Sequence, residues 1–294
     1  MKKIWQIIIM LGIAGCVFMA AGSFMGAGMQ MTLDSRGFHV GEATKAPDIR
    51  EPLEEFENIS IHGTHADVEL IASDKYYIEI LEDNEYSIKY EVRNGALTVR
   101  QENVWVWNIL NFKFSGPRLK IYVPKDAKLN DVFVGVSSGS ASVNGLNCAK
   151  LNAELASGSI RFAGITADTM RIGVASGKVT AQNAKADKLD ISVKSGSVNA
   201  WGISSKGLDV GISSGRAEIS GTLAGVNNVS VASGSVKLNI QGSKADYNRS
   251  ISVKSGTARV NGKKEEGDET YAKAKHSINV QVNSGTANIN FDKD

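Results

Sequence analysis

Two histidines stand close enough in the sequence to suggest metal chemistry. His62 and His65 are three residues apart in a segment with strand-like alternation. Successive residues of a strand point to opposite faces, so an odd separation places the two imidazoles on different sides. The pair is therefore a poor metal site, and the other two histidines, His39 and His276, are distant in the sequence.

Two pairs of aspartates have a spacing that could matter for catalysis. Asp168 and Asp187 are nineteen residues apart, as are Asp190 and Asp209. If the chain repeats with that period, each pair stacks in one column, and paired carboxylates can serve acid-base chemistry or bind calcium. Basic residues close by favour instead a solvated face of mixed charge. These basic residues are Arg171, Lys185 and Lys188.

The sequence lacks the motifs of several other chemistries. It contains no glycine-rich phosphate loop, no nucleophile elbow and no calcium-binding nonapeptide repeat. Cys16 and Cys148 are the only cysteines, and Cys16 lies in an apolar segment, so neither an internal disulfide nor a cysteine metal motif is expected. We therefore predict no catalytic residue, no metal and no cofactor.

An aromatic segment, VWVWNILNFKF, occupies residues 104–114. Trp105 and Trp107 are two apart and should share one face of a strand, with valines on the other face. Apolar residues on both faces are typical of burial, so we expect the segment to seal the first part of the core. The alternatives are a glycan or partner site at Trp105 and Trp107, or contact with a membrane interface.

The elements that position these residues are predicted from a repeat. A Ser-Gly pair recurs at nineteen-residue intervals, and then twice more after intervals of 22 and 29 residues. The residues five and three places before each glycine are all apolar, with polar or small residues between them. That alternation has the period of a strand with one buried face. The glycines of the pairs are Gly139, Gly158, Gly177, Gly196, Gly215, Gly234, Gly256 and Gly285.

A second short alternation follows each Ser-Gly pair, so each repeat is expected to carry two strands joined by a sharp turn. Glycine would supply the backbone freedom of that turn. Because one such unit cannot bury its apolar face alone, stacked units must share a core. The fold class is therefore all-β, a parallel β-helix-like solenoid with 19-residue coils. An outward column of mostly small residues should form a flat strip: Glu154, Gly173, Ser192, Gly211, Ser230 and Ser252.

The N-terminus has the properties of a membrane anchor. Residues 4–33 contain no charged residue. This uncharged run is long enough to cross a bilayer as a helix. Lys2 and Lys3 precede this run, so the positive-inside rule places the rest of the chain outside the cytoplasm. A lipoprotein cleaved and lipidated at Cys16 and a simple cleaved signal peptide remain alternatives. All three export the solenoid.

Charge excludes one class of partner. Lys2 and Lys3 are the only charged residues before Asp34, so residues 34–294 carry 31 basic and 31 acidic groups. A neutral body lacks the electrostatic footprint of a nucleic-acid-binding protein. We therefore expect no nucleic-acid partner, a membrane contact through the N-terminal helix, and a glycan or an envelope protein as the binding partner.

The sequence from FENISIHGTHADVELIAS, through LKIYVPKDAKLNDVFVGVSSGSASV, to the repeats resembles the bacterial putative-adhesin family, whose domain of unknown function is built of β-strand repeats. The resemblance covers about residues 56–294. It implies a β-helix-like fold and a location at the cell envelope, and it supplies no catalytic motif.

These observations predict four segments. Residues 1–33 form the anchor, 34–55 a linker, 56–130 irregular strands that start the solenoid, and 131–294 the regular repeats. The predicted function is a membrane-anchored, non-enzymatic surface protein that acts as an adhesin or envelope scaffold. The alternatives are an envelope-stress accessory or sensor protein and a polysaccharide-active β-helix enzyme, although a fold alone cannot assign an activity.

Overall fold

A computed structural model describes residues 29–34, 37–42, 48–63, 65–81, 86–103, 108–110 and 117–293. This part of the chain is all-β apart from one short 3-10 helix, η1 (Lys244–Asp246). The strands are β1 (Met29–Asp34), β2 (Gly37–Glu42), β3 (Asp48–Pro52), β4 (Asn58–Gly63), β5 (Asp67–Ser73), β6 (Tyr77–Leu81), β7 (Tyr86–Arg93), β8 (Ala96–Asn103), β9 (Asn108–Leu110), β10 (Arg118–Pro124), β11 (Leu129–Val136), β12 (Ser140–Asn144), β13 (Asn147–Leu155), β14 (Ser159–Ala163), β15 (Thr166–Val174), β16 (Lys178–Gln182), β17 (Lys185–Val193), β18 (Ser197–Ile212), β19 (Arg216–Val231), β20 (Ser235–Ser243), β21 (Tyr247–Val253), β22 (Thr257–Val260), β23 (Lys263–Lys264), β24 (Gly267–Glu269), β25 (His276–Val282) and β26 (Thr286–Lys293).

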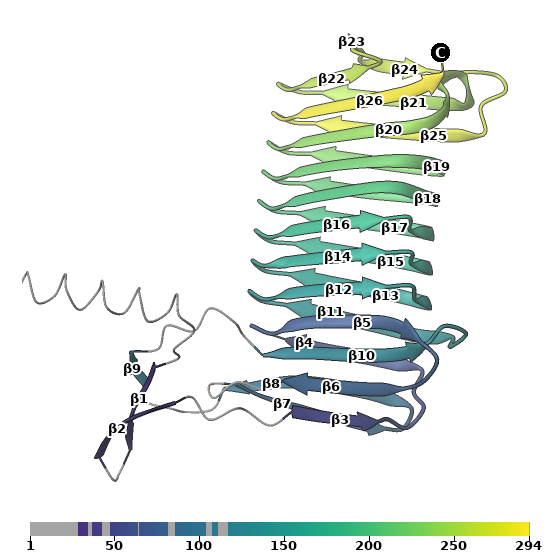
Figure 1. The fold of residues 1–294 in the computed structure, drawn as a ribbon. Coiled ribbons are helices and arrows are strands. Elements are labelled where there is room, and N and C mark those ends of the chain that lie inside the picture. Colours follow the sequence, from purple (N-terminus) through teal and green to yellow (C-terminus); the bar gives the residue numbers. More distant parts are fainter. Residues whose placement is uncertain are drawn as a thin grey trace, which may run out of the picture.

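Consecutive coils stack by parallel pairing with a shift of nineteen residues, as predicted. Val134 pairs with Ala153, for example, and Ala153 pairs with Ile172. Each coil contributes one strand to each of two faces, and the coils rise in a regular stack (Figure 1). The first face contains β4, β11, β13, β15 and β17, and the second face contains β5, β12, β14 and β16. The long strands β18 and β19 contribute to both faces.

The core lies between the two faces. The residues predicted to point inward, five and three places before each glycine, are buried in every case except Val253. Val253 is partly buried because it belongs to the outermost coil. A further inward column was not predicted, and it contains Val132, Leu151, Met170, Leu189 and Leu208.

The turn glycines are required for a reason other than the predicted one. None of the eight has a positive φ. Instead, the turns of successive coils stack so closely that a Cβ atom on Gly177 would lie 2.7 Å from the carbonyl oxygen of Gly158. The turn at the opposite edge of the stack is the one that uses positive φ, at Gly145, Gly164, Asn183 and Gly202. These four residues are also nineteen apart.

Antiparallel strands cover the ends of the stack. At the N-terminal end, β7 pairs with β8, and β3 pairs with β6. At the C-terminal end, β24 pairs with β21, and β23 pairs with β22. These strands occupy edges that would otherwise be open to pairing with another chain.

The N-terminal segments differ from expectation in two respects. The predicted linker, residues 34–55, contains β3, and Ile49 and Leu53 pack against the core, so the folded part starts near residue 48 rather than Phe56. Most of the predicted anchor, residues 1–28, lies outside the described residues. Its last residues are not helical as expected, because residues 29–34 form β1, which pairs with β2. Among the residues that the structure does describe, no helix is long and apolar enough to span a membrane.

Candidate functional site

A groove runs along the stack on the outer surface of the first face. It consists of two adjoining hollows of about 550 and 450 Å³, and Ser192 lines both of them. Its floor is the outward column that was predicted to be flat. In stacking order this column reads Gly135, Glu154, Gly173, Ser192, Gly211, Ser230, Gln281 and Ser252. Most side chains in this column are small, and Glu154 and Gln281 are the exceptions. The polar column on one side stands above the small residues of the floor.

One wall of the groove is a column of polar side chains connected between coils. Asn228 donates a hydrogen bond from Nδ2 to Oδ1 of Asp209 over 2.7 Å, and Asn279 donates to Oδ1 of Asn228 over 2.9 Å. Arg171 and Asp190 form an ion pair at 3.9 Å in the same column. The wall is therefore a ladder of amides and carboxylates that offers donors and acceptors along the axis.

Neighbouring groups keep the Asp209 carboxylate of this wall ionised. The hydrogen bond from Asn228 and the nearby Lys188 ammonium, 3.2 Å away, hold the pKa of Asp209 below its ordinary value, against the opposing effect of burial. A group that titrates below its usual range is a poor proton donor at neutral pH. Asp209 is thus suited to accept hydrogen bonds from a ligand.

The aspartate columns have the mixed-charge character that the sequence favoured. Asp187 pairs with Lys206 at 2.6 Å, and Asp190 and Asp209 pair with basic residues as described above. These partners are well exposed, so each pair contributes little to stability. Within the described ranges, no group of three or more histidine, cysteine, aspartate or glutamate residues is arranged to hold a metal ion.

His62 and Phe133 lie at one end of the groove. Their rings are 5.0 Å apart between centroids, and Nε2 of His62 lies 2.9 Å from the Ser60 hydroxyl. From the sequence, His62 was considered only as one half of a poor metal pair. Its position at the end of the groove, next to Phe133, was not predicted. The contact follows only from the pairing of β4 with β11, which joins residues 73 positions apart.

The serines of the Ser-Gly pairs lie at the turns of the stack. The serines that precede the turn glycines are exposed, and the backbone N–H of Ser176, for example, donates to the Ala156 carbonyl of the coil before. This arrangement is consistent with a role in the turn. Trp105 and Trp107, the predicted cap and alternative binding residues, lie outside the described residues.

The fold and the groove define a class of protein: an all-β solenoid whose parallel coils present a repetitive, polar outer face. The chain belongs to the Toastrack DUF4097 family, whose model matches residues 56–290. The resemblance that the repeats suggested is thereby confirmed.

Two solved structures match most of this chain. A structure named as a putative adhesin from Bacteroides fragilis NCTC 9343 matches with a TM-score of 0.50 at 15% identity, over 85% of this chain and 98% of that chain. A structure named as a putative lipid binding protein from Parabacteroides distasonis ATCC 8503 matches with a TM-score of 0.48 at 18% identity, over 84% and 96% of the two chains. No curated protein matches significantly.

Proposed function

We propose that this protein is a membrane-anchored component of the cell envelope whose groove on the first face binds an extended polymer, without catalysing a reaction. The observation that carries the proposal is the groove itself. Its floor of mostly small residues and its amide-carboxylate wall repeat with the coil spacing, so a long ligand that lies along the axis meets the same kind of contact several times. We favour a glycan chain, because hydroxyl, amide and carboxylate groups pair well with sugar hydroxyls.

The anchor and the location rest on the sequence. The uncharged run of residues 4–33 follows Lys2 and Lys3, which favours an N-terminus in the cytoplasm and a solenoid outside. The name of the Bacteroides fragilis structure, a putative adhesin, is in keeping with a binding role. The solenoid would then hold its groove away from the membrane as a rigid surface.

Binding of the purified solenoid, residues 48–294, to cell-wall material, exopolysaccharide and membrane proteins tests the proposal. Ser192→Tyr places a large side chain on the groove floor, where Ser192 is exposed. Asn199→Tyr adds the same side chain on the outer surface of the second face and serves as the control. We expect the first variant to lose at least tenfold in affinity for the polymer and the control to bind normally. Equal binding by both variants would place the ligand elsewhere.

The location is tested separately by external protease on intact cells. We expect the protease to remove the region after residue 48 while cytoplasmic proteins stay uncut. A fully protected solenoid would contradict the proposed orientation.

A further inference from the structure

The last two coils stack in the opposite order to their order in the sequence. Val280 of β25 pairs on one side with Val229 of β19 and on the other side with Ile251 of β21. On the second face, β26 lies in the same way between β20 and β22. The coil of residues 276–293 is thus inserted between the coil that ends at Ser243 and the coil of residues 247–260, as the colours at the top of Figure 1 show.

The repeat pattern alone does not explain this order, because the two coils are equivalent at most core positions. Ile251 and Ala258 of the outer coil correspond to Val280 and Ala287 of the inserted coil. Their turns also stack through the same kind of bond: Thr257 N–H donates to the Gly285 carbonyl, and Thr286 N–H donates to the Gly234 carbonyl. At these positions either coil could stack on β19 and β20, although β26 pairs with β20 as far as Phe291 and β22 has only four residues.

The two coils differ in the third inward column. Ile278 of the inserted coil is paired in register with Arg249 of the outer coil. Arg249 is 2% exposed, and its guanidinium is one of very few polar groups at an inward position. Charged residues are almost never buried without a partner, so the surroundings of this side chain decide whether the coil is stable.

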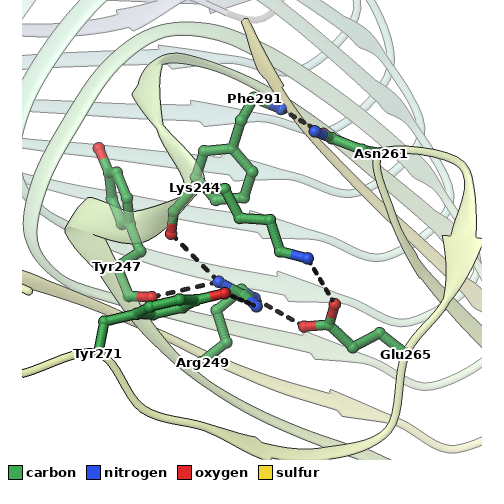
Figure 2. Close-up of polar contacts among 7 residues, drawn as sticks. All are labelled: Lys244, Tyr247, Arg249, Asn261, Glu265, Tyr271 and Phe291. Atoms are coloured by element: carbon green, nitrogen blue, oxygen red, sulfur yellow. Dashed lines mark hydrogen bonds and ion pairs between the residues drawn. The ribbon is translucent and has the colours of Figure 1, made fainter. Parts of the chain in front are cut away.

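In the observed order, Arg249 has its partners because its coil is outermost. Residues 261–275 pass over the end of the core and bring Glu265 to 2.6 Å from Nε and the Tyr271 hydroxyl to 3.4 Å from Nη2 (Figure 2). Nη1 donates to the carbonyl oxygens of Lys244 and Tyr247 at 3.2 and 3.3 Å. Glu265 is shared with the Lys244 ammonium at 3.3 Å.

In the sequential order, the coil of residues 247–260 would stack directly on β19 and β20. Arg249 would then lie between Asn227 and Ile278, since those residues occupy the same column on either side. Asn227 is 0% exposed, and its Nδ2 group donates to backbone carbonyls. Its Oδ1 atom has no hydrogen-bond partner and could accept one bond from the guanidinium, but an amide oxygen carries no charge to balance it. A guanidinium held in the middle of the column would lose its ion pair, and that loss is strongly destabilising.

We propose that Arg249 selects the order of the last two coils, and that the end of the solenoid is a two-state element whose second state is the sequential order. The order of the last two coils also determines which residues line the far end of the groove. Asn279 and Gln281 line its far end in the observed order, whereas Ser250 and Ser252 would take those places in the sequential order. An apolar residue at position 249 therefore exchanges two amides for two hydroxyls at that end.

Disulfide trapping distinguishes the two orders in the full-length chain with Cys16→Ser and Cys148→Ala. Asn228 and Asn279 are register partners, as are Asn279 and Ser250. Asn228 and Ser250 are therefore two strand spacings apart, about 9.6 Å, in the observed order. A disulfide requires Cα atoms within about 7 Å, so cysteines at 228 and 279 should cross-link and cysteines at 228 and 250 should not.

We expect Arg249→Leu to raise the cross-linking between positions 228 and 250 at least fivefold, at the expense of the pair 228 and 279. Arg259→Leu, on the exposed side of β22 in the same coil, is the matched control and should leave both yields unchanged. The double variant Arg249→Ile with Ile278→Arg moves the charge to the other coil and should give mainly the cross-link between 228 and 250.

Two results would overturn the proposal. One is that folded Arg249→Leu and the double variant both retain only the cross-link between 228 and 279. The other is that both variants fail to fold, as judged by circular dichroism and thermal melting. That failure would show that Arg249 is needed for any stable end and does not choose between two stacking orders.

Discussion

A Cβ atom added to Gly177 would lie 2.7 Å from the carbonyl oxygen of Gly158, its equivalent in the neighbouring coil. This distance is shorter than real Cβ contacts, and the opposing atom is backbone, so the coils would have to move apart. We therefore expect Gly177→Ala to lower the free energy of unfolding by about 2 kcal/mol or more, as overpacking does elsewhere.

Gly211→Ala is the matched control for that substitution. A Cβ atom there meets nothing within 4 Å, and Gly211 does not have a positive φ. Alanine within a strand should be neutral or stabilising by about 0.5 kcal/mol. Urea unfolding of both variants is the measurement, and equal destabilisation would contradict the stacking explanation.

The register of the first face predicts opposite effects for two adjacent residues. Val193 is 1% exposed and lies between Val174 and Ile212, whereas Ser192 is exposed. Val193→Asp buries a charge without a partner, so we expect a loss of roughly 3–5 kcal/mol. Ser192→Asp should change stability by less than about 0.5 kcal/mol. Similar melting temperatures for the two variants would show that the register is wrong.

The positive-φ turn predicts a dependence on side-chain shape at Asn183. This residue has a φ of 51°, in a column where three other coils use glycine. Asn183→Gly should be close to neutral, whereas Asn183→Val should cost about 1–2 kcal/mol because a branched Cβ is strained in this conformation. Gln182→Val, at the neighbouring exposed position on β16, is the control and should be mild. Thermal melts of the three variants test this.

Burial predicts that the thiol of Cys148 is unreactive. Burial, with Asp168 and Asp131 nearby, raises the pKa of Cys148 to about 12. The thiolate is the reactive form, so little of it is present at pH 8 in the folded protein. In a Cys16→Ser variant, labelling by a disulfide reagent at pH 8 should occur only as fast as the protein unfolds. Complete labelling within seconds under native conditions would be inconsistent with this burial.

The raised pKa of Tyr247 predicts that the folded protein loses stability at alkaline pH. Burial, with Asp246 and Asp292, raises the pKa of Tyr247 to about 12 from an ordinary value of 10.0. Between these values the unfolded state releases the proton and the folded state keeps it, so unfolding becomes more favourable as pH rises. We expect about 1 kcal/mol of loss per pH unit in this window.

Tyr247→Phe should reduce that alkaline slope in urea unfolding between pH 9 and 11. It should also lower stability at neutral pH by about 1 kcal/mol, because the Tyr247 hydroxyl donates to the Leu223 carbonyl at 2.9 Å. Burial and the hydrogen bond to Glu51 also raise the pKa of Tyr90 to about 12, so Tyr90 keeps part of the slope in the variant. An unchanged slope would mean that Tyr247 is accessible to solvent.

The repeat determined more of the fold than any other feature of the sequence. Alternation around each Ser-Gly pair predicted the strands, the parallel nineteen-residue register and the buried valines and isoleucines, because a strand with one buried face needs a period of two. The outward column of small residues could be predicted for the same reason. The prediction that the turn glycines supply backbone freedom was wrong. A glycine at a turn suggests such freedom in the sequence, but the close contact between Gly177 and Gly158 exists only once the coils are stacked.

The sequence alone therefore determined the coil, its inner and outer faces and the small-residue floor of the groove, because these follow from local alternation repeated at a fixed interval. Only the tertiary structure decided how coils that are distant in sequence meet. The pairing of β4 with β11 brings His62 to Phe133, and the insertion of β25 brings Asn279 to Asn228. Strands with equivalent repeat patterns can pair in more than one order. The choice depends on contacts such as that of Arg249 with Glu265, which residue spacing does not encode.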